Sequence, residues 1–170
     1  MNKIKLLILN RSNLLAVLEF SFLLSVALFA PLFKNQFITG PLVNAVLFLA
    51  TKGLGVEAGV LIGLIPSLIA LSVGLLPLIL APMVPFIMVG NAILVIVFSK
   101  LKEKNFWLGI FLSSFLKFLF LSFTSAFLFD VFFKKELSQK IALMISWPQL
   151  FTALSGGVIA FLILKILKRI

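Results

Sequence analysis

The sequence predicts an all-α integral membrane protein, a bundle of six transmembrane helices with both termini in the cytoplasm. Three observations support this fold class. Hydrophobic residues make up 62% of the 170 positions and charged residues only 12%, which is about half the charged share of a soluble domain. Apolar runs approach the ~20 residues that a helix needs to cross a bilayer, and polar or proline-rich segments separate them. Lys and Arg gather in the segments that a cytoplasmic N-terminus would place inside.

The length of the chain sets the number of helices. Six spans of ~20 residues use about 120 residues and leave room only for connections, so residues 1–170 are expected to form a single transmembrane domain without a nucleotide-hydrolysing module. The predicted spans are 14–33, 41–54, 56–76, 85–99, 106–129 and 147–167.

Local features justify each span in turn. The first follows a basic segment and is longer than the ~7–15 apolar residues of a signal peptide, so we expect it to be retained. The second begins at Pro41, which suits a first helical turn. The third ends at a proline-rich connection, and the fourth ends at the charged loop 100–104. The fifth ends before a polar stretch from Asp130, and residues 141–146 are expected to form a short interfacial helix before the sixth span.

The orientation follows from the basic residues. Ten of the fifteen Lys and Arg residues fall inside if the N-terminus is cytoplasmic, four fall outside, and Lys117 lies within the fifth span. The ten are Lys3, Lys5, Arg11, Lys52, Lys100, Lys102, Lys104, Lys165, Lys168 and Arg169, and the four are Lys34, Lys134, Lys135 and Lys140. An even number of spans then returns the C-terminus to the cytoplasm, and the net charge of +10 reflects membrane orientation rather than nucleic-acid binding.

The composition also restricts the chemistry. The chain has no Cys, His or Tyr, so thiolate catalysis, imidazole base catalysis and the commonest metal ligands are missing. The five acidic residues are scattered. We therefore predict that the protein is not an enzyme and has no catalytic residues, metal or cofactor.

Polar side chains gather in the outer half of the predicted bundle, where six of the seven prolines also lie. Irregular backbone at this depth must be buried in protein or line a wet cavity, so this half is predicted to hold a pocket reached from outside. The predicted substrate-binding residues are Asn35, Gln36, Thr39, Asn44, Asn91, Lys117, Thr124, Trp147, Gln149 and Thr152.

Several of these residues have alternative interpretations. Lys117 lies near the membrane midplane, where a charge is costly and usually functional; it either binds an anionic or carbonyl-bearing ligand or pairs with Glu19. Asn91 and Gln149 could instead form hydrogen bonds between helices, and Trp147 could be an interfacial anchor.

Small residues recur at four-residue spacing in two predicted spans. The third carries Gly55, Gly59, Gly63 and Ser67, and the first carries Ser21 and Ser25. Such ladders let another helix approach closely. They are predicted either to pack inside the bundle or to dock a partner subunit.

Three stretches resemble a known family. They are Asn35–Ala45 (NQFITGPLVNA), Leu61–Ser67 continued by Ala81–Asn91 (LIGLIPS and APMVPFIMVGN), and Trp147–Ala153 (WPQLFTA). Together with the six predicted spans, they resemble a poorly characterised prokaryotic group of S components, the substrate-binding subunits of energy-coupling factor (ECF) transporters.

The resemblance implies a function. S components bind a vitamin or another small micronutrient from outside and deliver it through a transmembrane coupling subunit driven by two cytoplasmic ATPases. The resemblance places the protein in a prokaryotic cell membrane, with Asn91, Lys117, Trp147 and Gln149 in the pocket region and Ser21 and Ser25 on a docking helix. The alternative function is a small secondary transporter or channel that works alone.

Overall fold

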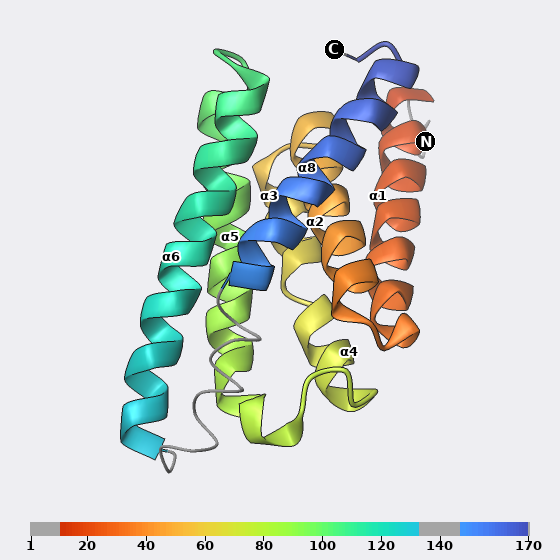
Figure 1. The fold of residues 1–170 in the computed structure, drawn as a ribbon. Helices are drawn as coiled ribbons and strands as arrows, with labels where there is room; N and C mark the ends of the chain where they lie inside the picture. Colours follow the sequence, from red (N-terminus) through yellow and green to blue (C-terminus); the bar gives the residue numbers. More distant parts are fainter. Residues whose placement is uncertain (1–10, 133–146, 170) are drawn as a thin grey trace, which may run out of the picture.

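The computed structural model describes residues 11–132 and 147–169, all of which are in helices or in the short turns between them (Figure 1). This confirms the all-α class for the described part of the chain. The elements are α1 (Arg11–Phe29), η1 (Ala30–Phe33), α2 (Gln36–Gly53), α3 (Val56–Gly63), α4 (Pro66–Ser72), η2 (Leu78–Met83), α5 (Val84–Leu101), α6 (Phe106–Phe132) and α8 (Trp147–Ile166), where η denotes a 3-10 helix. The interfacial helix expected at 141–146 lies outside the described residues.

Four described segments are long and apolar enough to cross a membrane. They are Asn13–Phe33, Leu78–Leu101, Phe106–Leu128 and Trp147–Ile166, with mean hydropathies from 1.8 to 2.3. Most of their side chains are not buried within the protein, and the outward-facing ones include large apolar groups such as Phe22, Phe123 and Ile166. Apolar helices with apolar outer faces are what a bilayer requires, so the structure supports an integral membrane protein.

Helix α2 occupies the centre of the bundle and packs against α1, α3, α5 and α8. Its residues from Val43 to Phe48 are all buried. Helix α8 approaches the α2 backbone closely at Gly156, where an added Cβ would lie 2.8 Å from both Pro41 O and Ala45 N. Because α2 mostly faces other helices, it tolerates more polar residues than a lipid-facing span, which explains why it is not among the four most apolar segments.

The predicted third span is not one helix, which corrects the expectation of a continuous span over 56–76. It consists of two helices, α3 and α4, and the helical structure is interrupted between Gly63 and Pro66. Proline lacks the N–H that would donate to Ile62 O, and its ring crowds that turn. The N–H groups of Leu64 and Ile65 instead donate to the carbonyls three residues earlier, over 3.4 Å each. After α4, Gly74 adopts a φ of +75°, which suits glycine and turns the chain again.

Two other boundaries differ from the prediction. Helix α2 begins at Gln36 rather than at Pro41, because Asn35 caps it by accepting a hydrogen bond of 2.9 Å from the Phe37 N–H. Pro41 is therefore in the second turn, within the helix. Helix α5 is preceded by η2, so the proline-rich connection is itself partly helical.

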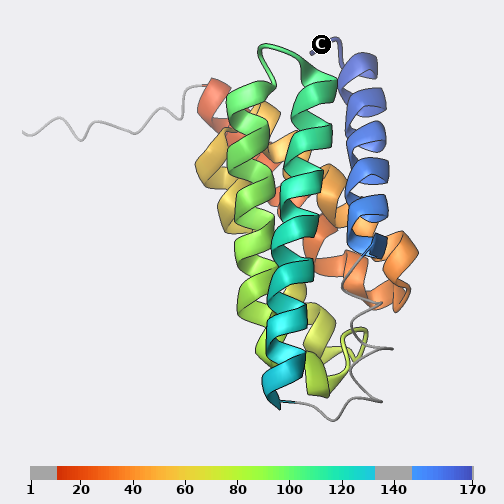
Figure 2. The same ribbon diagram turned by 60° about the vertical axis from the view of Figure 1, so that its left-hand side comes forward.

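The two ends of the bundle have different contents. One end, called here the terminal end, holds the start of α1, the end of α8 and the α5–α6 connection (Figures 1 and 2). The opposite half, called here the α4 half, holds α4, η2 and the connection between α1 and α2. This division separates a charged surface from a pocket.

Candidate ligand-binding pocket

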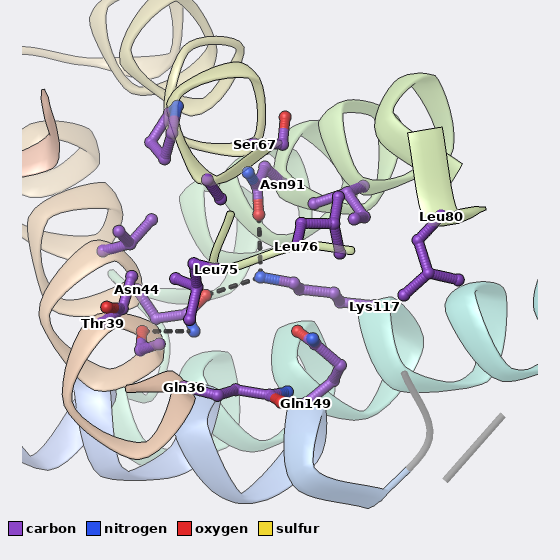
Figure 3. A pocket seen from close by; sticks show the side chains of 15 residues that line it. Gln36, Thr39, Asn44, Ser67, Leu75, Leu76, Leu80, Asn91, Lys117 and Gln149 are labelled. Carbon is purple, nitrogen blue, oxygen red and sulfur yellow. Dashed lines mark hydrogen bonds between the residues drawn. The ribbon is translucent and has the colours of Figure 1, made fainter. Parts of the chain in front are cut away.

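A cavity of about 110 Å³ lies in the α4 half, between α2, α4, α5, α6 and α8. Leu75, Leu76 and Leu80 from the connection after α4 and from η2 form part of its wall (Figure 3). Polar side chains reach it from α2, α5, α6 and α8. The pocket therefore combines an apolar wall with a small number of convergent polar groups, as small-molecule sites commonly do.

Lys117 on α6 is the central polar residue of this pocket, although it is only 3% exposed. Its Nζ donates hydrogen bonds of 2.7 Å to Asn44 Oδ1 on α2 and 2.8 Å to Asn91 Oδ1 on α5 (Figure 3). Three helices are thus joined through one ammonium group. A buried charge is tolerable only with such partners, because burial removes its hydration.

The two asparagines are oriented by backbone carbonyls. Asn44 Nδ2 donates to Gly40 O over 2.8 Å within α2, and Asn91 Nδ2 donates to Gly63 O over 2.7 Å. Gly63 is the last residue of α3, where helix carbonyls lack intrahelical partners. Each amide therefore donates one N–H to a backbone carbonyl and directs its oxygen at Lys117. The break before Pro66 thereby contributes to the orientation of the site.

Among the described residues no acidic side chain lines the pocket, and Lys117 does not pair with Glu19. Glu19 instead accepts two hydrogen bonds from Arg169, of 2.6 and 3.1 Å, at the terminal end. Of the two interpretations of Lys117, ion pairing with Glu19 is wrong. The positive charge of Lys117 meets only amide oxygens in the described part of the chain.

Six of the ten predicted site residues line this pocket, and four do not. The six are Gln36, Thr39, Asn44, Asn91, Lys117 and Gln149. Gln36 and Gln149 lie on the side of the pocket formed by α2 and α8 (Figure 3). Thr39 belongs to the lining, but its hydroxyl donates to Ala30 O over 2.8 Å and so connects α2 to η1.

The other four residues have structural surroundings of their own. Asn35 caps α2, and the Thr124 hydroxyl donates to Phe120 O, 2.7 Å away in the same helix. Trp147 is 56% exposed on the outside of α8. Thr152 is buried where α8 meets α2, with its side chain against Gly40. The sequence placed these residues at a suitable depth but could not tell which side of the helix they occupy.

The pocket-lining residues of α4 and of the connection after it were not predicted as substrate-binding residues. Pro66, Ala70, Leu75 and Leu76 line it, as does Ser67, which the sequence assigned to partner docking. Ser67 is 4% exposed, and its Oγ has no hydrogen-bond partner among the described residues. Pro66 was the available signal, since it is the one proline deep inside a predicted span.

The predicted docking residues also separate into two groups. Gly59 packs against Thr51 and Val95, and Gly63 packs against Leu47 and Asn91, so both serve internal packing. Gly55 precedes α3 with a φ of +98°, and the four-residue ladder from Gly55 to Ser67 does not share one helix. This corrects the expectation of one continuous ladder.

The ladder on α1 differs from the one on α3. Ser21 and Ser25 are both exposed, and the Ser25 hydroxyl donates to Ser21 O over 2.8 Å. Of the six residues predicted for docking, Gly59, Gly63 and Ser67 are buried, whereas these two serines and the half-buried Gly55 are accessible to a partner.

Charged side chains at the terminal end form ion pairs and a hydrogen bond to the backbone. Lys52 donates to Glu103 over 2.9 Å, and Lys102 donates to Thr51 O over 2.6 Å in the last turn of α2. The hydrogen bond from Lys52 lowers the pKa of Glu103, whereas burial lowers the pKa of Lys102. The bond to Glu19 raises the pKa of Arg169.

Among the residues that the structure describes, no group of three or more acidic, His or Cys side chains is placed to hold a metal ion. Comparison of the chain with protein-family models, with curated proteins and with solved structures finds no match. The interpretation of the pocket therefore depends on the residues that form it.

Proposed function

We propose that this protein is the substrate-binding subunit, or S component, of an ECF-type importer, and that it binds a vitamin-like or other small micronutrient from outside the cell. The observation that carries the proposal is the pocket around Lys117, whose ammonium group is held by amide oxygens from α2 and α5. The sequence resemblance described above supplies the transporter class.

The charge distribution supports the proposed orientation. Every described Lys and Arg residue outside the bundle core belongs to the terminal end except Lys34, which precedes α2. Under the positive-inside rule this end faces the cytoplasm. In the proposal six spans cross the membrane, namely α1, α2, the α3–α4 pair, α5, α6 and α8, with both termini inside. The pocket in the α4 half would then receive its ligand from outside.

The proposal also names the partners. A transmembrane coupling subunit and two cytoplasmic ATPases would drive delivery of the bound ligand, and the protein itself would catalyse no reaction. The exposed Ser21 and Ser25 on α1 leave a face that a partner helix could approach closely. The expected location is a prokaryotic cell membrane, with the chain as a multi-pass subunit.

Purification from native membranes tests the partner assignment. We expect a coupling subunit and two ATPases to co-purify with the protein, and we expect uptake to stop when the ATPases carry an inactivating substitution. Uptake that continues without ATPases and stops when the ion gradient is collapsed would support a stand-alone secondary transporter instead.

Substitutions in the pocket test the site assignment. Lys117→Ala and Gln149→Ala should each weaken binding of the transported molecule, because both side chains line the pocket. Thr124→Val is the matched control, since Thr124 bonds only within α6. If both pocket variants bind like the wild type, the site is misplaced.

A further inference from the structure

The ammonium group of Lys117 has bonding capacity that the protein does not use. It carries three N–H groups, and two of them donate to Asn44 Oδ1 and Asn91 Oδ1. No third hydrogen bond from Nζ to a described residue is present. Because Lys117 also lines the cavity, its remaining N–H is available to a ligand.

The surroundings of Lys117 disfavour a positively charged ligand. One N–H of each amide donates to Gly40 O or Gly63 O, and the two amide oxygens accept from the ammonium. A ligand therefore meets a donor at Lys117 and would be repelled if it brought a second positive charge. In the part of the chain that the structure describes, no carboxylate lines the pocket to balance such a charge.

From this arrangement we propose that the pocket binds a small monocarboxylate, with the carboxylate on Lys117 Nζ and a compact apolar body against the leucine wall. This inference rests on the proposed function for its biological meaning, because it specifies the class of molecule that the importer would carry. One buried positive charge matches one negative charge. A phosphate group, at about −1.5 to −2, would leave excess charge buried at the same place.

A second polar group in the lining favours an oxygen-rich head group. Ser67 presents a buried hydroxyl for which no described residue is a partner. A buried hydroxyl without a partner is unfavourable, and a ligand that carries acceptor oxygens offers lone pairs to which Ser67 can donate. An ammonium group has no lone pair and could not accept from either.

The size and lining of the pocket restrict the rest of the ligand. The cavity of about 110 Å³ is smaller than the roughly 150 Å³ of an engineered cavity that holds benzene. Val43, Leu75, Leu76, Leu80 and Ile87 supply its apolar wall. A ring or branched chain of about five carbon atoms is therefore of a size that this volume holds.

A matched series of compounds tests the proposal. The probes are cyclopentanecarboxylate, its primary amide, cyclopentylmethylamine and cyclopentane-1,1-dicarboxylate, added to the purified full-length protein at neutral pH and millimolar concentration. Titration calorimetry and thermal unfolding report binding. We expect the monocarboxylate to bind and to raise the Tm, the amide and the dicarboxylate to bind about tenfold or more weakly, and the amine not to bind.

Variants connect that selectivity to named residues. Lys117→Met keeps the length of the side chain and removes the donor, so carboxylate affinity should fall about tenfold to a hundredfold, as expected for a lost charge-assisted hydrogen bond. Ser67→Ala should weaken binding less, by a few-fold. Ala70→Leu narrows the pocket from α4 and should reduce binding of the ring while leaving Lys117 in place. Lys165→Gln, on the exposed part of α8, is the control and should leave binding unchanged.

The outcomes separate this inference from the proposed function. Equal binding of the acid and the amide, preferred binding of the amine, or no binding by any probe would overturn the monocarboxylate assignment. Each of those results is compatible with co-purification of the coupling subunit and ATPases. Selective carboxylate binding without any such partners would support the ligand class and count against the importer.

Discussion

The terminal end joins acidic and basic side chains in pairs at the surface, whereas the α4 half buries a lysine whose partners among the described residues are two amide oxygens. Glu19 pairs with Arg169 and Lys52 pairs with Glu103, with three of the four side chains at least a quarter exposed. Lys117 is 3% exposed and has Asn44 and Asn91 as partners. Exposed ion pairs such as those at the terminal end add little stability. The basic residues there instead suit orientation of the protein in the membrane. A buried charge without a counter-charge is costly and is therefore typical of a functional site.

The largest loss of stability should come from removing a hydrogen-bond partner of the buried Lys117 ammonium. Asn91→Leu removes an acceptor from Lys117 and the donor to Gly63 O, so the free energy of unfolding should fall by about 2–3 kcal/mol. Unfolding in detergent measures the change. Ser99→Ala on the same helix is the control, because Ser99 bonds only to Ile96 O.

A double variant shows whether the charge causes that loss. If Lys117→Met is added to Asn91→Leu, part of the stability should return, since no charge then remains buried without its partner. Additive losses would mean that the Lys117–Asn91 contact is not the cause.

The next largest effect concerns the contact that positions Asn44. Gly156→Ala places a methyl group against the α2 backbone at Pro41 O and Ala45 N, so α2 and α8 must separate. We expect a loss of about 1–3 kcal/mol from overpacking, together with weaker ligand binding because Asn44 moves. Ser155→Ala, at the neighbouring half-buried position, should leave both unfolding and binding unchanged. Wild-type behaviour of Gly156→Ala would contradict the close packing of these helices.

A smaller effect is expected at the terminal end. Glu19→Gln weakens the pair with Arg169, and because the pair is partly exposed the loss should be below about 1 kcal/mol and should shrink at high salt. Ligand binding should not change. A loss as large as that of Asn91→Leu would remove the contrast between the two regions.

The smallest effect is a pH dependence from Glu103. Its pKa is held below the ordinary value of 4.5 mainly by the hydrogen bond from Lys52, so the pair stabilises the folded state above that pH. The stabilisation is lost as the pH falls below 4.5 and through the folded pKa. The wild type should therefore show a slightly steeper decrease of Tm below pH 4.5 than Glu103→Gln. Parallel curves would contradict the contribution of this pair.

Composition and depth along the helices predicted much of this molecule. They predicted the all-α class, and they assigned Asn44, Asn91 and Lys117 to one pocket, where the structure brings the three side chains together. Depth does not give the angle around the helix axis. The inner face of α6 carries the buried polar residues Ser113, Ser114, Lys117 and Ser125. Thr124 bonds within α6 and Trp147 is exposed on α8, although depth alone assigned both to the pocket.

The pattern of apolar residues could not predict that α4 and the connection after it line the pocket. A run from Val56 to Leu76 reads as one span, and only the backbone chemistry of Pro66 and the turn at Gly74 divide it. That division places Ser67 over the cavity rather than on a docking face. It also leaves Gly63 O free to orient Asn91, a contact across 28 residues that no local pattern contains.

Native mass spectrometry of the protein purified without added substrate tests the central claim most directly. The account predicts that the wild type retains one small molecule and that Lys117→Met, prepared in the same way, retains much less of it, while Lys165→Gln retains as much as the wild type. A small molecule held equally by the wild type and Lys117→Met, or no small molecule in any preparation, would contradict a ligand site at Lys117.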